Sequence, residues 1–127
     1  MINLFVDLTR KFNEIMTKPI AFDDFTKVDI RVGTIIEVAD FPKAKRPAYQ
    51  LTIDFGSLGI KKSSAQITAR YSKDDLINKQ VTAIVNFEPK QIANFFSECL
   101  VLGVADDKGE IVLLQTTERV HNGNTVN

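Results

Sequence analysis

The chain has 127 residues, 44% hydrophobic and 25% charged, and its sixteen Lys and Arg residues balance sixteen Asp and Glu residues. This length suits one domain with a buried core, so a disordered chain is excluded, and no apolar run approaches the ~20 residues of a membrane span. Zero net charge argues against indiscriminate coating of nucleic acid, and a single cysteine favours a reducing compartment, for which we expect the cytoplasm.

Residues 1–18 are predicted to form a helical extension ahead of the main domain, residues 19–127. Apolar residues recur there at helical spacing, and Pro19 ends the pattern. Asp7 interrupts the apolar stretch and no basic residue precedes it, so we expect no signal peptide. An isolated helix of about 15 residues is only marginally stable, so its apolar face must pack either against the core of the same chain or against a second subunit. We expect a homodimer. That face carries Leu4, Phe5, Leu8, Phe12 and Ile15.

From Val28 onwards, apolar and polar residues alternate, which indicates β-strands. The first strand begins near Ile30, and Gly33 shifts its alternation, which predicts a β-bulge. Residues 49–55 alternate cleanly, as in a half-buried antiparallel strand. Further strands are predicted over residues 60–67, 81–87, 100–104 and 111–114, with a short helix capped by Ser72 and a turn at Asn122-Gly123.

At least five short strands, one short helix before the fourth strand and a bent first strand describe a small all-β barrel. The OB-fold, a five-stranded barrel, is the commonest such architecture. Alternation alone is equally compatible with a β-sandwich.

The sequence gives little support for catalysis, so we expect neither an enzyme nor a cofactor. Cys99 lies in an apolar strand, where a thiol usually packs inertly, and the only histidine, His121, lies beside a predicted turn. Gly56 and Gly59 lack the Lys-Ser/Thr pair of a phosphate-binding loop. The spacing of metal ligands is absent as well, so we expect no metal ion.

The segment from Lys61 to Thr68 places two cations before a run of small or amide side chains. Lys attracts phosphate, and Ser, Thr and Gln bond phosphate, sugar or base edges. The same groups suit a peptide backbone, and a solvated strand face with local turns explains them equally well. The segment is therefore a candidate ligand face with an open choice of ligand.

The segment from Asn86 to Glu98 follows a predicted central strand, so it lies at an end of the barrel. Pro89 prevents continued ladder pairing. Phe95 and Phe96 are adjacent, so we expect one exposed ring that serves either as a stacking platform for a base or as a subunit interface. Phe87 is expected instead to plug the barrel.

Positive charge is concentrated in the middle of the chain. Residues 41–95 hold nine Lys or Arg and four Asp or Glu (+5), residues 1–40 hold five and seven (−2), and residues 96–127 hold two and five (−3). The basic loop Lys43 to Pro47 joins the first two strands, a loop that flanks the ligand face of OB-folds. A balanced total is therefore compatible with a local anion-binding patch.

Four motifs of this chain occur in the same order in one known family. The resemblance is to the CsaA family of export-related chaperones, stand-alone relatives of the tRNA-binding domain that also resemble the C-terminal domain of many methionyl-tRNA synthetases. It covers about Ala21 to Val126. The motifs are Asp29-Ile30-Arg31-Val32-Gly33, Ser63-Ser64-Ala65-Gln66-Ile67-Thr68, Leu76-Ile77-Asn78-Lys79-Gln80-Val81, and Asn86-Phe87 followed by Ser97-Glu98.

This resemblance implies an OB-fold whose N- and C-terminal extensions build a homodimer and which has the capacity to bind tRNA. For CsaA itself it implies binding of unfolded preproteins for export, so the expected partners are tRNA and unfolded preproteins or the export machinery. A dedicated tRNA-binding factor is the alternative.

Two departures from the family pattern bear on the ligand. Glu88 stands where a second proline is usual, and Lys90 stands where arginine is common, which removes a bidentate fork suited to phosphate. By motif, the positions expected to contact tRNA or peptide are Lys61, Lys62, Ser63, Gln66, Asn86, Lys90 and Ser97.

Overall fold

The computed structural model describes residues 18–127, so nearly all of the predicted extension over residues 1–18, including its apolar face, lies outside the described residues. In residues 18–127, no helix is long and apolar enough to cross a membrane. Short helical segments are α2 (Phe22–Thr26), η1 (Gly56–Leu58) and α3 (Lys73–Leu76). The strands are β1 (Ile30–Asp40), β2 (Tyr49–Asp54), β3 (Ile60–Ala65), β4 (Gln80–Ile84), β5 (Lys90–Ile92), β6 (Phe95–Ser97), β7 (Leu100–Val101), β8 (Gly103–Ala105) and β9 (Ile111–Leu113).

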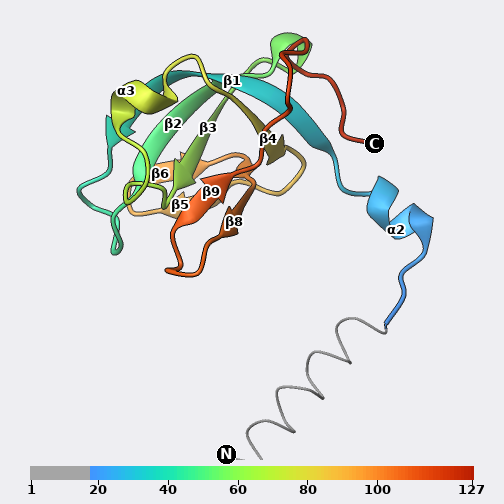
Figure 1. Cartoon of the computed structure of the whole chain (residues 1–127), viewed down its shortest axis with the longest axis horizontal. Helices are drawn as coiled ribbons and strands as arrows, with labels where there is room; N and C mark the ends of the chain where they lie inside the picture. Colours follow the sequence, from blue (N-terminus) through green and yellow to red (C-terminus); the bar gives the residue numbers. More distant parts are fainter. Residues whose placement is uncertain (1–17) are drawn as a thin grey trace, which may run out of the picture.

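Five strands form one curved antiparallel sheet in the order β3-β2-β1-β4-β7 (Figure 1). Two hairpins, β5–β6 and β8–β9, extend from it. The sheet curls into a nearly closed barrel, and the prediction of an all-β OB-fold is confirmed.

The first strand bends so that it can pair with two neighbours. Its first half, Ile30 to Thr34, pairs with β4, and its second half pairs with β2. The register against β2 shifts between Ile35 and Glu37, so the bulge lies near Ile36. The sequence predicted it three residues earlier, at Gly33. Gly33 has a different role, because a Cβ there would lie only 2.7 Å from side-chain atoms of Ile53 and Phe55. The glycine permits close packing across the barrel.

The barrel is filled by side chains from the inner face of the sheet. The largest fully buried apolar residues are Phe55, Ile35, Leu51, Ile53, Leu76 and Val81. The predicted cap at Ser72 is confirmed, since its hydroxyl accepts a hydrogen bond from the Asp75 N–H at 3.2 Å and so begins α3. This short helix places Leu76 in the core.

The C-terminal tail completes the edge of β1 that β2 leaves uncovered. The predicted turn at Asn122-Gly123 is present, with Gly123 at φ +92°. Beyond it, the Val32 N–H donates to the Asn124 carbonyl at 3.0 Å, and the Val126 N–H donates to the Ile30 carbonyl at 2.8 Å. The tail therefore lies along β1 as a short irregular strand.

Candidate ligand groove

A hairpin that the sequence did not predict follows β4. Its turn holds Ala93 at φ +55°, between β5 and β6. Phe95 is half-buried, with its ring centroid 5.3 Å from that of Phe41 in the loop between β1 and β2. Phe96 is 56% exposed, so the expectation of one exposed ring is confirmed. Phe87 is 53% exposed, and the expectation that it plugs the barrel is wrong, because the chain leaves the barrel after β4.

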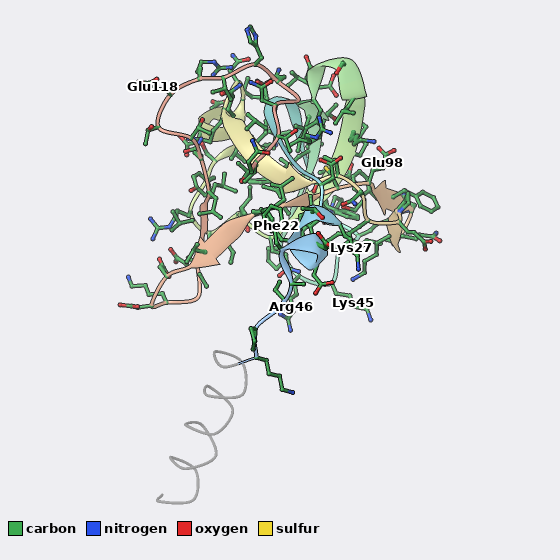
Figure 2. All side chains as sticks on the ribbon, turned by 90° about the vertical axis from the view of Figure 1, so that its right-hand side faces the viewer. Phe22, Lys27, Lys45, Arg46, Glu98 and Glu118 are labelled. Atoms are coloured by element: carbon green, nitrogen blue, oxygen red, sulfur yellow. The ribbon has the colours of Figure 1, made fainter. Side chains whose placement is uncertain are left out.

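The end of this hairpin is fastened to the free edge of β3 mainly through side chains. The Lys62 N–H donates to Glu98 Oε1 at 2.9 Å, and the Glu98 N–H donates to the Lys62 carbonyl at 2.8 Å. The Ser64 N–H donates to Ser97 Oγ at 3.1 Å. Figure 2 shows Glu98 on the hairpin side of the molecule, well away from Glu118 in the C-terminal loop. Ser97 and Glu98 thus take the place of a neighbouring strand.

Two adjoining hollows lie along the seam where β3 and β7 face each other, and we call them together the β3–β7 groove. Its two parts have volumes of about 380 Å³ and 410 Å³ and share Ser64, Gln66 and Leu100. The first part also has charged side chains in its lining, and its other lining residues are Phe87, Glu88, Lys90, Ile92, Ser97, Glu98 and Cys99. The second part is mainly apolar, and its other lining residues are Ala65, Ile67, Val101, Leu102, Gly103, Ile111 and Leu113.

Three of the seven positions expected to contact a ligand line this groove: Gln66, Lys90 and Ser97. Gln66 and Lys90 are exposed, whereas Ser97 is half-buried. The groove therefore brings together residues from two segments that are separate in the sequence, Lys61 to Thr68 and Asn86 to Glu98.

The other four predicted positions lie elsewhere. Ser63 is fully buried and donates to the Cys99 carbonyl at 2.9 Å, so its hydroxyl supports the barrel. The Asn86 side chain donates to the Lys27 carbonyl at 2.7 Å and accepts from the Asp29 N–H at 2.9 Å, which ties the end of β4 to the start of β1.

The two lysines at the start of the segment point to opposite faces of β3. Lys61 is half-buried and pairs in register with Ile53, whose side chain lies in the core. Lys62 is exposed on the outer face, where its Nζ donates to Thr52 Oγ1 at 2.9 Å. Only Lys62 therefore presents its charge on the outer surface of the sheet.

Several groove residues were not selected from the sequence. Ser64 is one of them; it alternates with the buried Ser63 and Ala65, so strand periodicity indicated which serine faces outward. Leu100 is 46% exposed, and no local signal distinguishes it from a core leucine. In residues 18–127, β7 is an outer strand of the five-stranded sheet, which leaves Leu100 at the groove.

Cys99 borders the groove without reactive character. It is 5% exposed, and burial raises the pKa of its thiol to about 11. The thiol is thus protonated at neutral pH, as expected for an inert packed cysteine.

The basic loop between β1 and β2 is anchored at one end and free at the other. Phe41 is buried against Phe95, so the loop and the β5–β6 hairpin meet. Lys43, Lys45 and Arg46 are exposed, and none of them forms an ion pair within residues 18–127. Figure 2 shows the Lys45 and Arg46 side chains pointing away from the barrel. These charges are available to an anionic partner.

Comparison with known proteins agrees with this fold. Residues 30–125 match the family model described as "Putative tRNA binding domain". The chaperone CsaA of Bacillus anthracis is 47% identical, with a TM-score of 0.82, over 87% of this chain and 100% of that chain. The CsaA chaperone protein of Picrophilus torridus is 53% identical, with a TM-score of 0.81, over 86% of this chain and 100% of that chain.

Curated relatives are longer proteins. The methionine--tRNA ligase of Thermococcus onnurineus is 38% identical over 104 residues, which are 82% of this chain and 14% of that protein. The methionine--tRNA ligase of Bacteroides fragilis is 34% identical over 125 residues, which are 93% of this chain and 18% of that protein. The chain therefore spans less than a fifth of the length of either relative. The chain therefore belongs to the tRNA-binding domain family, in a form that matches CsaA chaperones along their full length.

Proposed function

We propose that this protein is a CsaA-type chaperone that binds unfolded polypeptide, including preprotein segments destined for export, in the β3–β7 groove. The exposed apolar surface of this groove, at Phe87 (53%) and Leu100 (46%), carries the proposal. Ser64 and Gln66 add hydrogen-bonding groups beside that surface. An unfolded segment offers both apolar side chains and free backbone groups, which a groove of this composition suits. The full-length match to CsaA chaperones supports the proposal.

In this proposal the protein works in the cytoplasm as a homodimer. Residues 1–18 form the helical extension, and residues 19–127 form the ligand-binding domain. Ile20 and Phe22 are 72% and 74% exposed, and α2 projects from the barrel (Figure 1). Together with the apolar residues of the extension, they supply apolar surface for a second subunit.

Binding of tRNA is the second proposed activity, and a dedicated tRNA-binding factor is the alternative reading. The family match and the exposed cations of the loop between β1 and β2 favour it. Phe96, the exposed ring next to Phe95, which contacts Phe41 of this loop, is a candidate stacking platform. Because phosphate contacts release counterions, binding through them weakens steeply as salt rises.

One binding experiment tests these activities with a matched pair of variants. Phe87→Ala removes a ring from the groove, whereas Phe96→Ala removes a ring of similar exposure outside it. Each protein is titrated into a labelled unfolded preprotein and into labelled tRNA at low and high salt, with anisotropy as the readout. We expect Phe87→Ala to weaken preprotein binding about ten-fold, since one ring's burial is lost, and Phe96→Ala to leave it unchanged.

The salt dependence separates the two ligands. Preprotein binding is expected to persist at high salt, and tRNA binding is expected to fall steeply. No affinity for the unfolded preprotein at either salt concentration would contradict the chaperone proposal. Salt-sensitive tRNA binding in that case would establish the dedicated tRNA-binding factor, and undetectable tRNA binding at low salt would remove tRNA as a ligand.

A further inference from the structure

A separate hollow lies away from the basic loop between β1 and β2, and we call it the Arg119 hollow. It has a volume of about 190 Å³ and is more polar than either part of the β3–β7 groove. It lies between the start of β4 and the loop that follows β9, and its lining residues are Lys79, Gln80 and the loop from Gln115 to Arg119. Figure 2 shows Glu118 of this loop at the opposite end of the molecule from Lys45 and Arg46.

The guanidinium of Arg119 is held in place by two oxygen atoms of the barrel. Its Nη1 donates to the Asn78 carbonyl at 3.1 Å, and its Nη2 donates to Thr34 Oγ1 at 3.4 Å. A guanidinium carries five N–H groups, so several remain for a ligand. In residues 18–127, no carboxylate forms an ion pair with Arg119. A cation fixed in this way loses little side-chain freedom when it binds an anion.

Lys79 supplies the second cation of the hollow. Its ammonium group lies 5.8 Å from the centroid of the Tyr71 ring, and this cation–π contact restrains the side chain. Within the described part of the chain, Lys79 also has no ion pair with a carboxylate. The lining contains a single carboxylate, that of Glu118, so cations are in excess in the hollow.

The loop itself supplies backbone donors beside these cations. Among the residues that the structure describes, the successive N–H groups of Thr116 to Arg119 have no hydrogen-bond partner. Both ends of the loop are anchored on Gln80. Gln115 Nε2 donates to the Gln80 carbonyl at 2.8 Å, and the Val120 N–H donates to Gln80 Oε1 at 3.1 Å. Successive free backbone N–H groups in a concave loop form sites that suit anions.

We propose that the Arg119 hollow binds a phosphate group. Phosphate oxygens accept hydrogen bonds in several directions, so one phosphate can contact the Arg119 guanidinium, the Lys79 ammonium and backbone N–H groups of the loop together. A free phosphate ion and a phosphate of a nucleic-acid backbone share this chemistry. The hollow is separate from the β3–β7 groove and from the basic loop, so the site depends on neither of the activities proposed above.

Titration of the full-length protein with inorganic phosphate, followed by NMR of its backbone amides, tests the site. Phosphate replaces chloride at constant ionic strength, so general screening does not change. We expect saturable chemical-shift changes at the amides of Thr117 and Glu118. Lys79→Gln and Arg119→Gln should each weaken phosphate binding about five-fold, which is the upper range for an exposed ion pair. Lys45→Gln, which removes an exposed cation of the basic loop, is the matched control and should leave the affinity unchanged.

A second probe, a single-stranded oligouridylate without terminal phosphates, distinguishes the two sources of phosphate. Shifts at Thr117 and Glu118 that the oligonucleotide causes and Lys79→Gln weakens would identify a nucleic-acid backbone as the ligand. Such shifts with inorganic phosphate alone would identify a free phosphate ion. Arg119 also anchors the loop on Asn78, so Lys79→Gln is the variant that keeps this anchor. Absence of saturable shifts with both probes, or equal affinities of Lys79→Gln and the unmodified protein for both, would overturn the site.

Discussion

Gly33 shows how one missing side chain shapes the barrel. Because a Cβ at this position would lie 2.7 Å from atoms of Ile53 and Phe55, Gly33→Ala forces a fully buried pair to move. We expect a loss of about 1–3 kcal/mol in the free energy of unfolding, measured by urea denaturation. Adding Phe55→Leu should recover part of that loss. Equal destabilisation by Gly33→Ala in both backgrounds would contradict the proposed clash.

For single residues, the sequence indicated which positions break the strand pattern, but it did not indicate which neighbours they contact in the barrel. Gly33 interrupts the alternation of its strand, but Phe55 is distant in sequence, so the close approach is invisible locally. Of the neighbouring serines Ser63 and Ser64, strand period two separates a buried from an outward residue, but motif matching selected the buried one. Residue roles here depend on which face of the strand becomes the barrel interior.

At the scale of elements, the link between β6 and β3 is held mainly by side chains. Glu98→Ala removes the acceptor of the Lys62 N–H, whereas Glu98→Gln retains a carbonyl oxygen. We expect Glu98→Ala to cost about 1 kcal/mol in unfolding free energy and Glu98→Gln to cost less. Urea denaturation measures both, and the Lys62 amide should exchange faster only in the alanine variant. If the two variants behave alike, the hydrogen bond to this amide does not hold the link.

The principal strands were predictable because each carries several alternating residues. The β5–β6 hairpin was not, since its strands have three residues each and follow Pro89. It is stabilised by contacts that are distant in sequence, such as Phe95 against Phe41, which joins segments more than fifty residues apart. The bulge was predicted at Gly33 but lies near Ile36, because its position depends on the register in which β1 pairs with β2. That pairing, like the contact between Phe95 and Phe41, joins residues that are distant in sequence.

For the whole molecule, the central prediction is its oligomeric state. The monomer mass is 14.2 kDa, so light scattering at micromolar concentration should give about twice that value for the proposed homodimer. Leu8→Lys places a charge among the apolar residues of the extension and should shift the mass toward the monomer. Asp7→Lys, which changes a residue outside the apolar set Leu4, Phe5, Leu8, Phe12 and Ile15, is the control. A monomer mass for the unmodified protein would refute the dimer.

The charge distribution illustrates what the sequence could and could not place in space. The sequence showed that the positive excess lies in residues 41–95. In the structure, these cations lie on several different surfaces. Lys43, Lys45 and Arg46 lie on one loop, whereas Lys90 lies at the groove. Lys62 is on the outer face of the sheet. Sequence proximity therefore overstated how far the positive charge is gathered into one patch.

The pairing of the C-terminal tail with β1 has a consequence for the order of folding. Residues 123–126 bind Ile30 to Val32 across ninety or more intervening residues. Closing such a long loop is entropically unfavourable until intervening structure has shortened the effective distance. The sheet around β1, β2 and β4 must therefore assemble first, and until the tail docks, one half of β1 presents an open edge. During that interval the folding chain itself resembles the unfolded polypeptides that the mature protein is proposed to bind.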